Sequence, residues 1–349
     1  MQPVEIHRLP MAHPADLRSL EMLIDGGLPV ASIRAIWCKT AGTGLLNDYS
    51  RDYAELAITQ LLHHRQAAPG SDAARIQIVV SGGCEGIVAP HLLVLADARG
   101  VPNGTCGLVA GWETEIIDRA AAGTPEHAHT TAAMVRRAAA AAGLAAPGDV
   151  ALAIVRAPVE EMTAPRVRAA RLAAAAGVGL ATGYLPELPP DLAAGFDGPP
   201  NIFAVARADD SAQQVVVLGN GRGARSPQQI ACGALADALD SPAVAGLLDR
   251  LGIAARPQAA PRDAARIRGV FIKGDAPAQR LRGWLHTMHD DPTLPMHRQS
   301  RAAYAAMVGS VTGQSALFVS GGAEGHGPRD GGLLIVIAQS PPPQEDVKP

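Results

Sequence analysis

The chain carries one serine motif twice. Residues 80–86 read VSGGCEG and residues 319–325 read VSGGAEG. An apolar run precedes each copy, so Ser81 and Ser320 are expected where a buried strand ends in a glycine turn. At such a turn the hydroxyl is accessible, and Gly82 or Gly321 lets backbone N–H groups approach a bound oxygen. A single copy would indicate a structural turn; two copies with the same flanks favour nucleophilic chemistry with an oxyanion site.

Two lysines precede the serines at similar spacing. Lys39 lies 42 positions before Ser81, and Lys273 lies 47 positions before Ser320. A lysine can accept the proton of a serine hydroxyl if burial or a nearby cation disfavours its ammonium form. Arg51 and Arg301 follow the two lysines on predicted helices. A solvated helix face would explain either arginine alone, but their recurrence between lysine and serine favours a place in a common site.

The elements that must position these residues follow one order: a strand ending in lysine, a helix, a strand ending in serine, and a closing strand. In the first unit these are residues 30–38, 47–64, 76–80 and 91–96, with Asp48 or Ser50 as a helix cap. In the last unit they are residues 267–272, 295–308, 316–319 and 333–338. The internal repeat predicts similar α/β modules.

The middle of the chain has the same order without the serine motif. Helical patterning covers residues 113–142 and 164–176, strands are expected at 149–155, 203–206 and 215–218, and the proline-rich residues 185–200 form a connecting loop. Arg156 stands where the outer units carry lysine. We therefore predict an α/β fold of three pseudo-symmetric repeats around a central pseudo-threefold axis, with units at residues 1–104, 105–250 and 251–349.

Composition excludes several classes of protein. A net charge of −3 and 3% aromatic residues offer neither a basic field nor stacking platforms, so no nucleic-acid partner is expected. The chain shows neither a signal-peptide pattern nor a long apolar segment, which predicts a cytoplasmic protein without membrane contact. The four cysteines, Cys38, Cys84, Cys106 and Cys232, lack the spacing of a zinc site and are expected to be small buried residues.

Taken together, these motifs resemble the cyanuric acid hydrolase and barbiturase family, the ring-opening amidohydrolases. The first repeat is matched by Lys39-Thr40-Ala41-Gly42-Thr43-Gly44, Asn47-Asp48, Arg51, the serine motif at 81–86, and Pro90-His91. The third is matched by Arg282-Gly283, His286-Thr287-Met288, Arg298, Arg301, the serine motif at 320–324, and Gly327-Pro328. The resemblance runs essentially end to end.

The resemblance implies a site to which each repeat gives a lysine, an arginine and a serine, matched to a small planar heterocyclic substrate with alternating carbonyl and N–H groups. It implies hydrolysis of one ring C–N bond by serine–lysine chemistry, with no cofactor for catalysis, in a homotetramer. The substrate-binding residues carried over are Arg51, Gly82, Arg171, Arg301 and Gly321, with Arg156 beside them.

The middle repeat departs from the family. Arg171 matches the family's arginine, but the serine pair falls on Val205 and Ala206, its glycine on Arg207 and its lysine on Arg156. We expect Ala206 to correspond to Ser81 and Ser320, and Arg156 to lower the pKa of the two lysines. Two hypotheses remain: an outer dyad, preferentially Lys39/Ser81 over Lys273/Ser320, opens a cyclic amide or imide, or the protein binds a heterocycle or a partner without hydrolysis.

A structural cation is the last feature that the resemblance implies. In the family, a carboxylate two places after the third lysine and a loop of mostly backbone carbonyls hold a hard cation. Here the carboxylate would be Asp275, and oxygen ligands suit Mg²⁺ or Ca²⁺. The loop ligands would be Ala323, His326, Gly327, Pro328 and Gly331. An empty glycine-rich loop is the alternative.

Overall fold

The computed structural model describes residues 2–43, 48–65, 76–98, 106–208, 210–275, 280–289 and 295–340. The described chain folds as three successive units with the order β-α-β-α-β-β, to which the third unit adds a short helix and a two-stranded hairpin. The first contains β1 (Gln2–Pro10), α1 (Arg18–Asp25), β2 (Ile33–Ala41), α2 (Ser50–Arg65), β3 (Gln77–Gly83) and β4 (His91–Asp97). The second contains β5 (Cys106–Glu115), α3 (Pro125–Ala142), β6 (Val150–Pro158), α4 (Ala164–Ala181), β7 (Ile202–Arg207) and β8 (Gln213–Arg222). The third contains β9 (Gln228–Leu235), α5 (Ser241–Asp249), α6 (Pro261–Ala264), β10 (Ile267–Gly274), β11 (Arg280–Leu281), β12 (Trp284–Leu285), α7 (Met296–Thr312), β13 (Phe318–Ser320) and β14 (Gly332–Gln339).

Each unit forms the same four-stranded arrangement. The strand orders are β3-β2-β4-β1, β7-β6-β8-β5 and β13-β10-β14-β9, and the first two join through β1 and β5 into one eight-stranded sheet. In each unit the second strand pairs parallel with the strand after its helix and antiparallel with the closing strand. The antiparallel pairing with the closing strand shifts register near the start of the second strand in every unit. The shifts lie between Ile33 and Ala35, Val150 and Leu152, and Ile267 and Gly269. The predicted three-repeat α/β fold is thereby confirmed.

Two expectations about the elements need correction. Residues 106–115 form strand β5, where helical patterning was expected from residue 113, and α3 begins only at Pro125. Strand β9 pairs along its whole length with β14, so the third sheet begins at Gln228 and takes in residues that the predicted division at 250/251 assigned to the second unit. Of the two residues proposed to cap α2, Asp48 accepts a hydrogen bond from the first helical N–H, Ser50 N, at 2.9 Å. Gly44 and Asn47 of the lysine motif lie outside the described residues.

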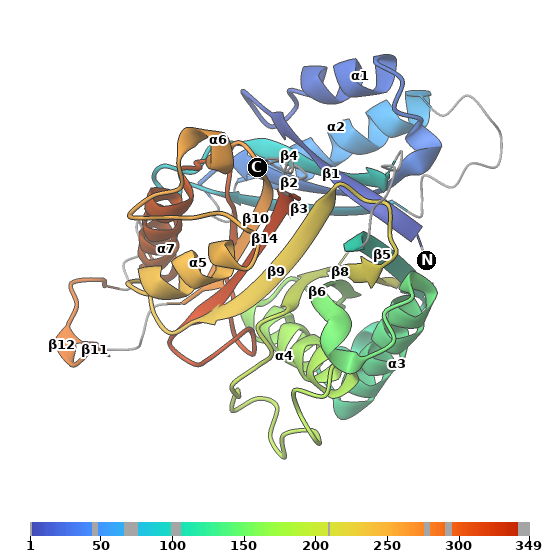
Figure 1. Cartoon of the computed structure of the whole chain (residues 1–349). Coiled ribbons are helices and arrows are strands. Elements are labelled where there is room, and N and C mark those ends of the chain that lie inside the picture. Colours follow the sequence, from blue (N-terminus) through green and yellow to red (C-terminus); the bar gives the residue numbers. More distant parts are fainter. Residues whose placement is uncertain are drawn as a thin grey trace.

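The helices of each unit pack on the outer face of its four strands. The inner face of these strands is turned to the middle of the molecule (Figure 1). The chain has only four phenylalanines, and three of them meet with a tryptophan at that centre. Trp37 of β2 lies 5.3 Å from Phe271 of β10, and Phe203 of β7 lies 5.3 Å from Phe318 of β13, measured between ring centroids. Buried aromatic pairs contribute both area and specific geometry, so this cluster fixes the three inner faces relative to one another.

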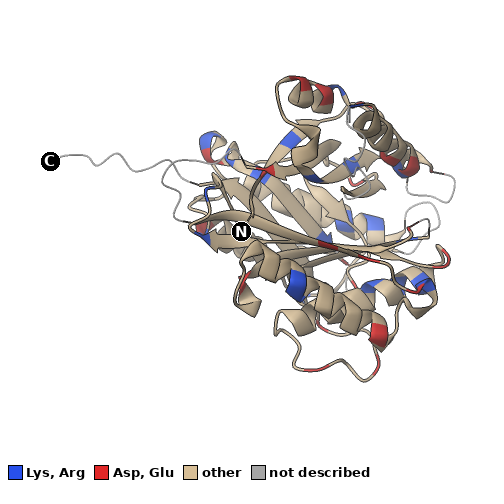
Figure 2. Ribbon diagram, turned by 90° about the vertical axis from the view of Figure 1, so that its right-hand side faces the viewer, with Lys and Arg blue, Asp and Glu red and all other residues tan. Residues whose placement is uncertain are grey.

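The remaining surface carries charges of both signs, which are scattered over helices and loops (Figure 2). No helix in the described ranges is long and apolar enough to cross a membrane.

Candidate active site

The three four-stranded units together line one pocket of about 630 Å³. Its wall includes the ends of β3, β7 and β13 and the first turns of α2, α4 and α7. The candidate residues that it brings together are Ser81, Gly82, Ser320, Gly321, Lys273, Asp275, Arg51, Arg156, Arg171 and Arg301. Lys39 lies directly behind Ser81 and is 2% exposed. Residues predicted from two distant motifs thus face a common cavity, and Ser81 and Ser320 do not open onto separate surfaces.

Strand register places Lys39 against Ser81. The two are direct partners across the parallel strands β2 and β3, and Lys39 Nζ lies 3.3 Å from Ser81 Oγ. The Ser81 hydroxyl donates to Val319 O at 2.8 Å, and Lys39 Nζ donates to the same carbonyl at 3.0 Å. Burial lowers the pKa of Lys39 to about 8, Glu85 opposes this shift and the nearby Arg301 adds to it. A neutral amine is therefore accessible near neutral pH, which is what a general base for a serine requires.

Glu85, four residues after Ser81, holds two cations in this wall. Its carboxylate, with no exposed area, lies 2.8 Å from Lys39 Nζ through Oε2 and 2.8 Å from Arg301 Nη1 through Oε1. Arg301 also donates to His297 O at 3.0 Å, and burial lowers the arginine's pKa against the opposing effect of Glu85. The sequence analysis did not predict this role, although Glu85 and Glu324 lie at the same distance along the chain after Ser81 and Ser320.

In the third repeat the lysine is bound differently. Lys273 is the register partner of Ser320, but its Nζ donates to the carbonyls of Ala204 at 2.7 Å, Gly322 at 3.1 Å and Gly321 at 3.4 Å. No hydrogen bond joins it to Ser320, whose hydroxyl contacts Gly321 O at 3.5 Å. Burial, and then Arg171, hold the pKa of Lys273 well below its usual value. The Lys273 amine therefore binds backbone carbonyls, whereas the Lys39 amine contacts the serine of its own repeat.

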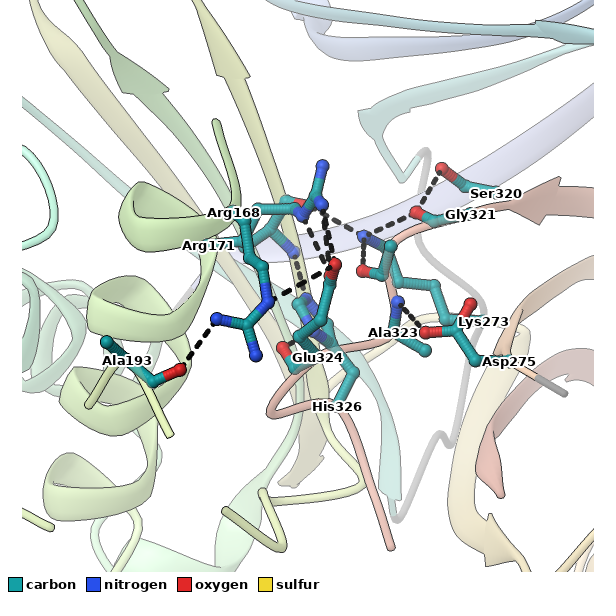
Figure 3. Close-up of polar contacts among 12 residues, drawn as sticks. Arg168, Arg171, Ala193, Lys273, Asp275, Ser320, Gly321, Ala323, Glu324 and His326 are labelled. Carbon is teal, nitrogen blue, oxygen red and sulfur yellow. Dashed lines mark hydrogen bonds and ion pairs between the residues drawn. The ribbon is translucent and has the colours of Figure 1, made fainter. Parts of the chain in front are cut away.

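Glu324 pairs with Arg171 as Glu85 pairs with Arg301. The Glu324 carboxylate accepts from Arg171 Nη2 at 3.0 Å, and Figure 3 shows it between Arg171, Arg168 and the amine of Lys273. Arg171 also lies so close to Gly322 that a Cβ there would stand 2.4 Å from the guanidinium carbon. Both arginines therefore reach the pocket with their charge already paired to a carboxylate of another repeat.

The middle repeat corrects two expectations. Parallel strands β6 and β7 pair Arg156 with Val205, so Val205 is the counterpart of Ser81 and Ser320, and the prediction of Ala206 is wrong by one residue. Arg156 Nη2 lies 2.6 Å from Asp210 and 2.7 Å from Glu55, and Nη1 donates to Ile78 O. Its charge is neutralised there. The cations that lower the lysine pKa values are Arg301 and Arg171, so the predicted effect of Arg156 is also wrong.

Arg51 differs from the other pocket arginines. Its side chain packs over Gly82, where an added Cβ would stand 2.8 Å from Arg51 Cγ. Its Nε is buried without a hydrogen-bond partner, and within the described ranges no carboxylate pairs with it. Its counterparts Arg171 and Arg301 are both ion-paired. Arg51 therefore offers the pocket N–H donors for a ligand oxygen.

The loop predicted to hold a cation is closed by its own hydrogen bonds. Asp275 Oδ2 accepts from Ala323 N at 2.9 Å, and the carbonyls of Ala323, Pro328 and Gly331 accept backbone hydrogen bonds. The His326 ring contacts Glu324 O through Nδ1 at 2.8 Å and accepts from Ala204 N through Nε2 at 2.9 Å. In the described ranges no group of three His, Cys, Asp or Glu side chains could hold a metal. In this arrangement the loop oxygens are already engaged in hydrogen bonds within the protein, and we assign no step to a cation.

Other serines and cysteines lie away from the pocket wall. Ser226 is buried and donates to Val4 O at 2.6 Å, while Ser211 is exposed, and neither lines the pocket. All four cysteines are free. Cys38 is buried as predicted, whereas Cys84 is exposed and Cys106 and Cys232 are half-buried, so the expectation is wrong for Cys84.

Fold and site together define a three-repeat α/β protein whose repeats surround one pocket containing a contacting serine–lysine pair. Comparison with known proteins agrees. The sequence model of the "Amidohydrolase ring-opening protein" family matches residues 5–183 and 170–339, so the chain belongs to the ring-opening amidohydrolase family. A cyanuric acid amidohydrolase of Pseudonocardia dioxanivorans is 33% identical over 97% of this chain and 98% of its own. A cyclic amide hydrolase of Azorhizobium caulinodans is 33% identical over 92% and 95%.

Solved structures give the same relationship. A structure described as cyanuric acid hydrolase, "evolutionary innovation by structural concatenation", superposes with a TM-score of 0.87 at 30% identity, covering 97% of this chain and all of the other. A second, the cyanuric acid hydrolase of A. caulinodans, gives a TM-score of 0.82 at 30% identity, covering 97% and 99%.

Proposed function

We propose that the protein is a hydrolase that opens a cyclic amide or imide by breaking one ring C–N bond, with Ser81 as nucleophile and Lys39 as base. The observation that carries the proposal is the 3.3 Å contact between the buried Lys39 Nζ and Ser81 Oγ at the wall of the pocket. Relatives named cyanuric acid amidohydrolase and cyclic amide hydrolase support the reaction class.

The chemistry follows from these two groups. Neutral Lys39 takes the Ser81 proton as Oγ attacks the ring carbonyl carbon, and the developing oxyanion is stabilised by nearby N–H donors such as those of Arg51. The C–N bond then breaks, and the ring nitrogen receives the proton from Lys39. A water molecule, deprotonated by the same amine, hydrolyses the resulting ester and frees Ser81.

The other dyad suits a binding role. Lys273 donates to three carbonyls and has no hydrogen bond to Ser320, so it is poorly placed to take that hydroxyl's proton. Ser320 still lines the pocket and can bond the far side of a ring. The rival hypothesis, binding of a heterocycle without hydrolysis, would need no lysine with a lowered pKa beside a serine.

Matched serine variants test the assignment. Ser81→Ala is expected to lower kcat by about a thousandfold or more, as the loss of a nucleophile does in serine hydrolases, while Ser320→Ala mainly raises KM. The assay is carboxylate release from cyanuric acid, barbiturate and simple cyclic imides. Full turnover in both variants on a confirmed substrate, or dependence on Ser211 or Ser226, would refute the Lys39/Ser81 assignment. Absence of turnover by the unaltered protein across these rings would favour the binding hypothesis.

Four further expectations stay proposals. We propose a homotetramer, tested by light scattering, and a cytoplasmic protein with neither nucleic-acid nor membrane partners. We also retain a structural Mg²⁺ or Ca²⁺ at the Asp275 loop as a proposal that needs the loop to rearrange. Metal analysis of protein purified without chelator tests it.

A further inference from the structure

One third of the pocket wall differs chemically from the other two. Val205 takes the place that Ser81 and Ser320 occupy in the other repeats, by strand register. Ala206 follows it where the others have Gly82 and Gly321. A hydroxyl and a glycine are thus replaced by an isopropyl and a methyl group. Any ring held by the two serines must turn its third edge toward these carbons.

The polar groups beside Val205 are engaged with one another. Arg156 is bound by Glu55, Asp210 and a main-chain carbonyl, and Arg207 lies 2.9 Å from Asp52 and 3.3 Å from Glu55. The pairs with Glu55 and Asp52 cross from the second repeat to helix α2 of the first. Both guanidinium groups are thus already bound to carboxylates, so a ligand carbonyl here would lose water and compete with a carboxylate for its partner.

The apolar character of this side extends outward. Ala206 packs in a small buried cluster with Ala122, Val159 and Ala170, and Val167 packs against that cluster. Val167, Met162 and Ala164 line the pocket with Val205 and Ala206. Met162 is 52% exposed, so the wall continues toward the pocket mouth and offers a flexible surface for an added group.

We propose that the substrate is a cyclic imide or ureide with a saturated, alkyl-bearing carbon at the ring position facing Val205. This inference rests on the proposed function and names its substrate class. In a six-membered ring, alternate atoms point in directions 120° apart, as the repeats of a threefold site do. Two carbonyl carbons of an imide then face Ser81 and Ser320, and the carbon opposite the imide nitrogen faces Val205. A ring with a third carbonyl, such as cyanuric acid, presents an unpaired oxygen there.

The test separates binding from turnover. Titration calorimetry on Ser81→Ala measures affinity for glutarimide, for dimethylglutarimide with both methyl groups on the carbon opposite the nitrogen, and for cyanuric acid. We expect dimethylglutarimide to bind about tenfold or more tightly than glutarimide, within the 10–200-fold range for an added methylene in an apolar pocket. Equal or weaker binding of the dimethyl compound, or no binding of any probe, would overturn the inference.

A wall variant then localises the effect. Val205→Thr keeps the shape of the side chain and adds a hydroxyl, and Val205→Ser restores the residue type of the other repeats. In the Ser81→Ala background, both are expected to lower the preference for dimethylglutarimide over cyanuric acid by about tenfold. Ala146→Ser, at an exposed loop position, is the control and should leave the ratio unchanged. An unchanged ratio in folded Val205 variants would contradict the proposal. Turnover by the unaltered protein tests the proposed function separately. Hydrolysis of any of these rings would support that function, and hydrolysis with a preference for cyanuric acid would contradict only the substrate class.

Discussion

Lys39 of the first repeat donates to Val319 O, the carbonyl just before Ser320 of the third repeat, at 3.0 Å. Lys273 of the third repeat donates to Ala204 O of the second, and Arg156 of the second donates to Ile78 O of the first. The three strand-end cations therefore close a ring of contacts, each reaching into a different repeat. Two members of this ring are lysines whose burial lowers their pKa, so the contacts that join the repeats also prepare the base.

The proposed base sets the pH dependence. The pKa of Lys39 lies at about 8, and the ammonium form, which dominates below that pH, cannot accept a proton. We expect kcat/KM to rise with pH and to level off above a midpoint near 8. Initial rates across pH in constant ionic strength check this. A profile that falls through the same range would contradict a lysine base.

Glu85→Gln should change both the profile and the stability. Because the Glu85 carboxylate raises the pKa of Lys39, its neutral isostere should move the midpoint of the pH profile downward. The same change leaves Lys39 and Arg301 buried without a counter-charge, which costs about 3–5 kcal/mol of unfolding free energy. Glu115→Gln is the control, because its partner Arg137 is exposed and such pairs contribute about 1 kcal/mol or less. An upward shift of the midpoint would contradict the assigned network.

Arg51→Ala should weaken ligand binding more than stability. The Arg51 guanidinium has an unpartnered donor at the pocket, and a hydrogen bond to a charged group contributes about 1.5–3 kcal/mol. Calorimetry with glutarimide on the Ser81→Ala background measures the loss. Arg65→Ala, on the same helix but paired with Asp25 at the surface, is the matched control. Equal ligand affinities in the two variants would show that Arg51 does not contribute to binding.

Gly198→Ala tests the contact between the second and third repeats. A Cβ on Gly198 would stand 1.6 Å from Gly325 O, a main-chain atom of the last residue in the second serine motif. The clash can be relieved only if the backbone moves. Overpacking of this kind lowers the free energy of unfolding by about 1–3 kcal/mol. Gly148→Ala is the control, since nothing lies within 4 Å of the added carbon. Denaturant unfolding curves compare them, and a stable Gly198→Ala variant would show that the two loops separate freely.

Much of the fold was predictable because its signals are local. Apolar runs that end in lysine or serine mark β2, β3, β10 and β13, and two parallel strands that end together bring their last residues side by side. Register is not local: counting along the chain placed the serine counterpart at Ala206, whereas the β6–β7 ladder selects Val205. Strand β9 was missed since its first residues, Gln228 and Gln229, interrupt the apolar pattern, and its assignment depends on pairing with β14.

The site was predictable to the same extent. Repetition singled out the outer lysines and serines with Arg51 and Arg301, whereas Arg171 came from the family resemblance. The partners that set their charge, Glu85, Glu324 and Glu55, act across repeat boundaries, and a sequence carries no direct record of which distant residue meets which. Glu85 and Glu324 could have been found from their equal offset after the serines, but Glu55 has no such counterpart.

The ring of contacts between repeats has a consequence for how the site can vary. Each strand-end cation, with the carbonyl it binds, forms a junction made from two repeats, so no single repeat contains a complete one. The chain has three such junctions within one covalent frame. Arg156 supplies the cation of one junction, where the other two junctions have Lys39 and Lys273. In a repeated architecture of this kind, the residues that contact the ligand can change in one repeat while the serine–lysine pair of another repeat stays in place.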